Sequence, residues 1–263
     1  AQSAGRRRQL GIDETTLARS REVCGAALQG GKQLSRAAMF ALLQSHGIAT
    51  VGQRGIHILG HLAQEGLLCL GSRAGKQFTF ALLQDWAPGA RTMEPDAARC
   101  ELARRYFTGH GPATVQDFAW WTGQTLGDAR RALAGASEHL VQAQIDGKTY
   151  WMGPAPAPQE APASAVYLLP GFDEYMLGYH DRSAVLSPEH APQIHPGANG
   201  MLHATLVVDG RIQGVWRRTL KKKSVLVTIS PFGTLKPGQK QAAEAAAARY
   251  AAFLGLSLEL EYP

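Results

Sequence analysis

The fold is decided by a stretch that reads Thr114-Val115-Gln116-Asp117-Phe118-Ala119-Trp120-Trp121. Thr114 and Asp117 match the start of a helix, with Asp where a capping box usually has Glu. A second helical run follows from Thr125 to Ala134, and the same two residue types open it, since Asp128 stands three residues after Thr125. The spacing predicts two short helices joined by a tight turn, which is helix-turn-helix geometry.

A hairpin is expected directly after these helices. Asp146-Gly147 marks its turn, because a two-residue type I′ turn needs φ > 0 at both positions. Strands from Leu140 to Ile145 and from Thr149 to Met152 flank the turn. Two helices followed by a hairpin with a basic tip describe a winged helix.

The same plan occurs about eighty residues earlier in the chain. A helix capped by Ser35 is expected to end at His46-Gly47, a second helical run ends near Gly66, and strands flank the tip at 72–76. In the second run, helical spacing predicts that four residues face the core. These are Ile56, Leu59, Leu62 and Ala63. Winged helices mostly bind nucleic acid, so the repeat predicts a function as well as a fold.

Beyond the repeats the chain changes character. Residues 154–165, rich in Pro and Ala, read as a semi-rigid linker. The remainder predicts strands at Val166–Leu169, Met201–Val208, Arg211–Leu220, Val225–Ile229 and 256–260, with one long helix over Pro237–Leu254. The predicted class is therefore α+β: tandem winged helices over 1–88 and 89–153, then a small, mostly antiparallel β domain over 166–263.

Composition and charge limit the partners. The chain has 263 residues, 45% of them hydrophobic, and a net charge of +6. This length can bury a substantial core and form two or three domains. The positive charge favours a polyanionic partner, although basic surfaces also occur on ordinary enzymes.

The cysteines and the apolar runs indicate the cellular compartment of the protein. Cys24, Cys69 and Cys100 are far apart and odd in number, which fits neither a zinc site nor a disulfide framework. A reducing cytoplasm is the simplest setting. No apolar run approaches the ~18 residues that a membrane span needs. We therefore expect a cytoplasmic protein with no membrane partner.

Candidate DNA contacts lie on the predicted recognition helices and wing tips. Outward positions on the helices could contact phosphates or guanine edges, although any exposed helix face also carries polar residues. Cations on the wing tips could contact phosphates, which position a protein without specifying sequence. The helix candidates are Gln53, Arg54, His57, Arg130 and Arg131, and the wing candidates are Arg73, Lys76 and Lys148.

Two further clusters are polar enough to act in binding. A basic run comprises Arg217, Arg218, Lys221, Lys222 and Lys223. Arg217 and Arg218 should point to opposite faces of a strand, so at most one joins the lysine turn. The alternative is a charged turn that keeps an edge strand soluble.

The second cluster is a loop that follows a predicted strand. Its candidate functional residues are Asp173, Tyr179, His180, Asp181 and Arg182. Loops that gather such residues are often functional, and the alternative is a plain Asp181–Arg182 ion pair that fixes the loop.

Metal and cofactor sites are not expected. His57 and His61 are four residues apart on one predicted helix, which is a spacing that can bind zinc. The Glu of a metalloprotease helix is absent from His57–His61, and no third ligand is evident. Packing or a groove contact is the favoured role for both histidines, and no cofactor is predicted.

Five segments of the chain occur in a recognisable combination: 53–67, 103–107, 111–114, 117–121 and 168–182. Together they resemble a known family, the bacterial winged-helix DNA glycosylases of the AlkZ/YcaQ type. The resemblance covers essentially the whole chain, and its most specific parts are 117–121 and 168–182. It implies tandem winged helices and a β-rich domain wrapped around duplex DNA in a bacterial, nucleoid-associated protein. It also implies removal of alkylated bases, including unhooking of interstrand crosslinks.

The resemblance has one departure. Family members carry an additional N-terminal winged helix with a Gln-x-Gln or Gln-x-Asp motif that handles the attacking water and the sugar cation. This chain is expected to begin after that module, so its repeats would be the family's second and third. Gln142-Ala143-Gln144 has the same letters but falls on a wing strand. There a solvent-facing polar pair is the ordinary outcome, rather than catalysis by Gln142 and Gln144.

The sequence therefore leaves three functions to compare. The first is duplex binding as the scaffold part of a repair glycosylase, without robust base excision by this chain. The second is a non-enzymatic winged-helix regulator or architectural DNA-binding protein. The third is a protein-interaction module whose winged helices never touch DNA.

Overall fold

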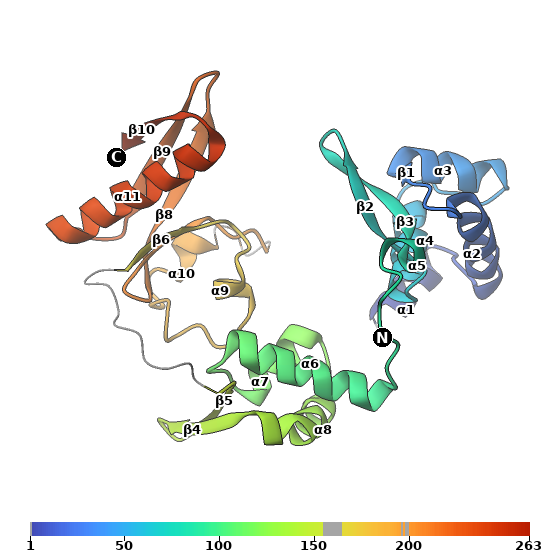
Figure 1. The fold of residues 1–263 in the computed structure, drawn as a ribbon, viewed down its shortest axis with the longest axis horizontal. Helices are drawn as coiled ribbons and strands as arrows, with labels where there is room; N and C mark the ends of the chain where they lie inside the picture. Colours follow the sequence, from blue (N-terminus) through green and yellow to red (C-terminus); the bar gives the residue numbers. More distant parts are fainter. Residues whose placement is uncertain (1, 155–164, 196, 198–199) are drawn as a thin grey trace. The chain divides into compact units, whose positions relative to one another are not determined.

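A computed structural model describes residues 2–154, 165–195, 197 and 200–263. The chain divides into two compact units, residues 1–92 and 93–263, here called the N-terminal and C-terminal units. Each unit is described by itself (Figure 1). The four-part division expected from the sequence stays a prediction, and most of its linker lies outside the described residues.

The N-terminal unit is a winged helix with an additional helix at its start. Its helices are α1 (Gln2–Gln9), α2 (Glu14–Leu28), α3 (Arg36–Ser45), α4 (Arg54–Gln64) and the short α5 (Leu83–Trp86). The strands β1 (Leu34–Ser35), β2 (Leu68–Ala74) and β3 (Gln77–Leu82) form an antiparallel sheet in the order β1-β3-β2. The predicted wing is the β2–β3 hairpin, which Figure 1 shows projecting from the helices.

Side-chain caps begin α2 and α3, and the cap at Ser35 is the predicted one. The Asp13 carboxylate accepts from Thr16 N at 2.8 Å, and the Ser35 hydroxyl accepts from Ala38 N at 3.2 Å. Such caps satisfy backbone donors that a helix start leaves open. Gly55 lies where α4 passes Phe40, since an added Cβ would lie 2.6 Å from the Phe40 ring.

The core of this unit corrects one prediction. Ile56 and Ala63 are exposed, whereas Ile58, Leu59 and Leu62 are buried on α4. The buried face of α4 is therefore rotated from the predicted one, because α2 and α3 pack against Ile58 rather than Ile56. The wider core comprises Leu17, Leu28, Met39, Leu43 and Leu68 with these α4 residues.

The C-terminal unit begins with the second winged helix. Its helices are α6 (Pro95–His110), α7 (Val115–Thr122) and α8 (Leu126–Ala136), followed by the 3₁₀ turn η1 (Ser137–His139). The strands β4 (Val141–Ile145) and β5 (Lys148–Met152) pair in antiparallel fashion, with Asp146 at φ 49° and Gly147 at φ 73° in the turn. The predicted I′ hairpin is thus confirmed.

The turn between α7 and α8 is also as tight as predicted. Thr114 and Asp117 form a complete capping box at the start of α7, and Thr125 caps α8 by accepting from Asp128 N at 3.1 Å. Gly123 ends α7 in the left-handed conformation, with φ at 68°. Glycine suits this position because it has no Cβ to clash.

A five-stranded sheet completes the unit. Its strands are β6 (Val166–Leu169), β7 (Thr205–Val208), β8 (Arg211–Leu220), β9 (Ser224–Pro231) and β10 (Ser257–Glu261), in the order β10-β9-β8-β7-β6. All neighbours are antiparallel except β10 and β9, because α11 (Pro237–Leu254) carries the chain back before β10. The predicted mostly antiparallel sheet with one long helix is confirmed.

The two faces of the sheet are covered differently. The Ala243, Ala247 and Ala251 side chains of α11 pack on one face, against Val225 and Val227 of β9. The chain between β6 and β7 covers the other face and contains the short helices α9 (Glu174–Leu177) and α10 (Ala191–Ile194). The polar loop predicted to be functional is the first part of this covering segment. Within the described residues, no helix is both long and apolar enough to cross a membrane.

Candidate nucleic-acid interface

The chain's own N-terminal segment contacts α4 at Gln53, Arg54 and His61, whereas Ile56, Gly60 and Ala63 of the helix stay exposed. Arg6 on α1 donates to the Gln53 side chain at 2.7 Å, and Arg7 Nη1 lies 3.2 Å from His61 Nδ1. The basic residues Arg6, Arg7 and Arg8 thus lie on a helix that packs against α4.

Arg54 is engaged as well. Its guanidinium donates to the carbonyls of Ala49 at 3.1 Å and Gly11 at 2.7 Å, and also to the Leu10 carbonyl. Gln53 and Arg54 therefore tie α1 and the following turn to the start of α4. Groove contact by these two residues stays a prediction, and the observed contacts favour a structural role. His57 is half-buried on the same helix.

The wing of the N-terminal unit presents its cations freely. Lys76 is exposed, and the Arg73 guanidinium lies over the Phe78 ring at 5.1 Å. Neither residue forms an ion pair with another described residue. A stacked guanidinium keeps its N–H groups available to an anion.

A bulge in β2 aims this wing tip. The register shifts between Leu70 and Arg73, and the Gln33 side-chain oxygen accepts from Ser72 N at 2.7 Å and from the Thr79 hydroxyl at 2.7 Å. Gly71 makes room, since an added Cβ would lie 2.5 Å from that oxygen. Bulges commonly re-aim side chains in this way.

The candidate DNA-contact residues of the second winged helix differ in whether they form ion pairs. Arg130 is exposed and has no ion pair within the described residues, whereas Arg131 pairs with Asp128 on its own helix. Lys148 at the second wing pairs with Asp181 at 2.8 Å. This contact raises the pKa of Lys148, and the same contact together with Ser183 holds the pKa of Asp181 well below its usual range.

The basic run occupies the β8–β9 hairpin. Lys221 pairs with Glu259 of β10, whereas Arg217, Lys222 and Lys223 are exposed and have no ion pair with any described residue. Arg218 contacts Tyr250 of α11 from the other face of β8, with its guanidinium carbon 5.6 Å from the ring. The predicted opposite orientation of Arg217 and Arg218 is consistent with this contact. Three free cations therefore lie at or near one hairpin turn.

Asp117 joins the polar loop to the second winged helix. Its carboxylate is buried and accepts four hydrogen bonds: from Thr114 N at 2.9 Å, Thr114 Oγ1 at 2.7 Å, His180 N at 2.9 Å and Asp181 N at 3.2 Å. One oxygen caps α7 and the other holds the loop. The sequence reveals only the capping role, because the loop lies more than sixty residues away.

Phenol hydroxyls reinforce this junction. Tyr106 on α6 donates to the Gly178 carbonyl at 2.7 Å, and Tyr179 donates to the His110 carbonyl at 2.6 Å. Burial is the main cause that raises the pKa of both phenols. Glu174 adds an acceptor for His110 Nε2 at 3.1 Å and for Trp121 Nε1 at 3.2 Å. Neither His110 nor Glu174 is among the residues singled out from the sequence, since only their contact gives them a role.

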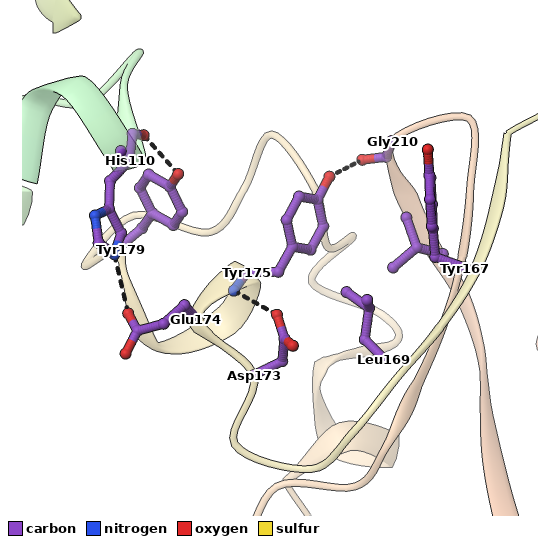
Figure 2. Close-up of a pocket in the computed structure, with 10 residues that line it drawn as sticks. His110, Tyr167, Leu169, Asp173, Glu174, Tyr175, Tyr179 and Gly210 are labelled. Atoms are coloured by element: carbon purple, nitrogen blue, oxygen red, sulfur yellow. Dashed lines mark hydrogen bonds and ion pairs between the residues drawn. The ribbon is translucent and has the colours of Figure 1, made fainter. Parts of the chain in front are cut away.

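His110, Glu174 and Tyr179 of this junction line an open cavity of about 510 Å³, which Figure 2 shows in close-up. Tyr175 lies within it, with its hydroxyl on the Gly210 carbonyl at 2.6 Å, and Asp173 accepts from Tyr175 N at 2.9 Å. Its lining also includes Tyr167 and Glu174 but no Lys or Arg. An acidic, aromatic lining does not suit a polyanion.

Three further residues of the polar loop, His180, Asp181 and Arg182, contact different groups. Arg182 Nε donates to the Met176 carbonyl at 2.6 Å, and its guanidinium lies 5.2 Å from the Trp120 ring. The predicted alternative of an Asp181–Arg182 ion pair is wrong, because Asp181 turns to Lys148 and Ser183 instead. His180 is exposed and lies beside Trp120, with ring centroids 6.3 Å apart.

Nothing in the geometry gives the glutamine pair a catalytic environment. Gln142 and Gln144 are exposed on β4, and Gln144 donates to the Thr149 hydroxyl at 2.7 Å. The same letter pattern recurs at Gln144–Asp146 and Gln239–Gln241. Asp146 stands in the exposed hairpin turn, and Gln239 accepts from Lys236 N at the start of α11.

No metal site emerges either. In the part of the chain that the structure describes, no three His, Cys, Asp or Glu residues are grouped to hold an ion. His61 contacts Arg7 through one ring nitrogen and Glu65 through the other at 3.2 Å. His61 thus acts within the packing of α1 on α4.

Comparisons with known proteins agree with the sequence resemblance. A family model described as DNA glycosylase AlkZ-like matches residues 1–253. The interstrand DNA cross-link repair glycosylase of Streptomyces sahachiroi is 30% identical over 209 residues, which cover 76% of this chain and 55% of that protein. The solved structure of Streptomyces sahachiroi DNA glycosylase AlkZ superposes with a TM-score of 0.78 at 25% identity, covering 98% of this chain and 72% of that one. The chain thus spans about half the length of the curated relative.

Proposed function

Because the chain belongs to the AlkZ-like family of DNA glycosylases, we propose that it binds duplex DNA through two basic hairpins during the repair of damaged bases. The first hairpin is β2–β3 with Arg73 and Lys76, called the wing hairpin. The second is β8–β9 with Arg217, Lys222 and Lys223, called the sheet hairpin.

The observation that carries this proposal is the free state of these cations. Some other cations form ion pairs, such as Arg21 with Glu65 at 2.6 Å and Lys221 with Glu259, whereas Lys32 and Arg36 are exposed without an ion pair to a described residue. What distinguishes the five hairpin cations is that they are free and also grouped on two hairpins. The five hairpin cations have no acidic partner among the described residues. A free, exposed cation can replace the counterions of a DNA phosphate without first breaking a contact. Arg130 on α8 offers one more such group.

The contacts of α1 favour the hairpins over the recognition helix. Gln53 and Arg54 would have to leave their partners on α1 and the following turn before they could read a base edge. Wing-type contacts go to phosphates and carry little sequence information. Duplex binding that tolerates many sequences is therefore the expected behaviour, which suits a protein that searches for lesions.

We expect this chain to bind the duplex without releasing a base. Cleavage of a glycosidic bond passes through an oxocarbenium-like state that needs a positioned water and nearby stabilisation. Gln142 and Gln144 are exposed on a wing strand and face no enclosed site. A duplex carrying N7-methylguanine should keep its lesion when it is incubated with this chain, and measurable release of the base would overturn this part of the proposal.

The hairpin assignment is tested with paired variants. Arg73→Ala/Lys76→Ala and Lys222→Ala/Lys223→Ala should each weaken duplex binding and lower the slope of log affinity against log salt by about one per lost phosphate contact. Arg21→Ala and Lys221→Ala are matched controls, because these cations are already paired. Fluorescence anisotropy with a labelled duplex measures both quantities. Equal losses for hairpin and control variants would contradict the assignment.

The same assay separates the proposal from a non-enzymatic regulator. A repair protein should bind duplexes of different sequence about equally and should prefer a damaged duplex. A regulator should prefer one sequence and should ignore the lesion.

A further inference from the structure

In the polar loop between β6 and α10, the acidic and the basic side chains differ in their partners. Its acids are engaged by protein groups: Asp173 caps α9, Glu174 accepts from His110 and Trp121, and Asp181 pairs with Lys148. Its bases are not neutralised in this way. Arg182 lies over the Trp120 ring, and the His180 ring contacts the same tryptophan in an edge-type arrangement.

Arg182 is a half-buried cation that has no counter-ion among the described residues. Its Nε donates to the Met176 carbonyl at 2.6 Å, and no carboxylate of the described residues lies within ion-pair distance. Burial lowers the pKa of the Arg182 guanidinium, so desolvation is not offset by a nearby negative charge. A further basic group lies near Arg182, since burial and, to a smaller extent, the charge of Arg182 lower the pKa of His195. Partly buried charges are normally paired, so this one favours an anion from outside the chain.

Trp120 lies beneath the Arg182 guanidinium. The guanidinium carbon lies 5.2 Å from the Trp120 ring, and the His180 ring lies 6.3 Å from the same ring. Asp117 fixes the loop backbone at His180 and Asp181, so the geometry is set before any ligand arrives. The terminal nitrogens of Arg182 make no hydrogen bond with the described residues. A planar fork of free N–H groups matches the two oxygens of a phosphate.

We propose that Arg182, stacked on Trp120 beside His180, binds one phosphate group of the DNA backbone. The proposal rests on the duplex binding proposed above and adds a contact that belongs to neither basic hairpin. An arginine stacked on a tryptophan can also serve packing alone, and the experiment is designed to separate the two roles.

The test compares Arg182→Gln, Arg182→Lys and Trp120→Phe with the control Arg249→Gln, an exposed arginine of α11. Arg182→Gln should weaken duplex binding about tenfold, the loss of one charge-assisted contact, and should lower the salt slope by about 0.9. Arg182→Lys should recover part of the affinity, because charge is kept but the fork is lost. In the wild-type chain, duplex addition should quench tryptophan fluorescence, and Trp120→Phe should remove part of that quench.

The outcomes distinguish the alternatives. If Arg182→Gln lowers the unfolding temperature but leaves affinity and salt slope at the Arg249→Gln values, the contact is packing and the proposal is wrong. If inorganic phosphate alone produces the full Trp120-dependent quench at the same phosphate concentration, the site takes free phosphate and the duplex assignment is wrong. A wild-type chain that does not bind a duplex overturns both this contact and the proposed function. Loss confined to the Arg182 variants and the hairpin variants supports both.

Discussion

Replacing Asp117 with Asn should loosen the C-terminal unit at its central junction. The carboxylate accepts four hydrogen bonds, two on each oxygen, and its side chain is buried. An amide has only one accepting oxygen, so one pair of donors must face an NH₂ group. The cheaper orientation turns the amide nitrogen towards Thr114, whose hydroxyl can accept while its backbone N–H loses its partner.

The expected loss follows from these contacts. A hydrogen bond to a charged group contributes about 1.5–3 kcal/mol, and the remaining bonds lose their charge assistance. Asp117→Asn should therefore lower the free energy of unfolding of the C-terminal unit by about 3 kcal/mol. For a unit of this size each kcal/mol moves the unfolding temperature by about 2–4 °C, so a shift of about 6–12 °C is expected.

Asp128→Asn is the matched control. Asp128 occupies the corresponding position on α8 but is partly exposed, accepts from the Thr125 hydroxyl and pairs with Arg131. Its replacement should cost about 1 kcal/mol or less, as for exposed pairs and dipole contacts. Calorimetry gives the unfolding temperatures, and hydrogen exchange reports the amides of His180 and Asp181. Equal shifts for both variants, or unchanged exchange in Asp117→Asn, would refute a junction built on this carboxylate.

Three further predictions concern the wing and the titrating groups. Gly71→Ala should displace Gln33 from the β2 bulge and weaken duplex binding, and adding Gln33→Met should cause little further loss in the same anisotropy assay, because both changes release one bulge. Tyr106 has a raised pKa, so the stability that its neutral form contributes is present below about pH 10 and is lost as the pH rises further; absorbance at 295 nm should show it ionising later in the native than in the denatured chain. Asp181 has a lowered pKa, so the contribution of its ion pair is present above about pH 4 and is lost as the pH falls; Lys148→Ala should flatten this acid dependence of the unfolding midpoint.

Local signals in the sequence predict much of the fold. The caps at Ser35 and Thr114 and the turn at Asp146-Gly147 involve neighbours within three residues, so their chemistry is readable before folding. The fold class and the order of helices and strands along the chain follow from such signals. The inward face of α4 is less readable, because Ile56 and Ile58 are equally apolar and only the packing of α2 and α3 selects between them.

The candidate interface depends on distant contacts that no local pattern encodes. Arg54 and Lys148 look equally suited to a phosphate in the sequence. The structure engages Arg54 with carbonyls of the turn after α1 and Lys148 with a carboxylate that lies thirty-three residues away. Lys222 and Lys223 have no such partners in the described chain. The distinction between an engaged and a free cation therefore requires the tertiary structure.

The dependence of duplex affinity on salt tests the central claim most directly. Binding through phosphates releases condensed counterions, so log affinity should fall linearly with log salt, with a slope of about −0.9 per contact. Four or five engaged hairpin cations would give a slope near −4. The account predicts a steep slope for this chain that becomes shallower in the Arg73→Ala/Lys76→Ala and Lys222→Ala/Lys223→Ala variants. A flat dependence, or no binding at low salt, would contradict duplex binding by these hairpins and would favour winged helices that serve protein contacts.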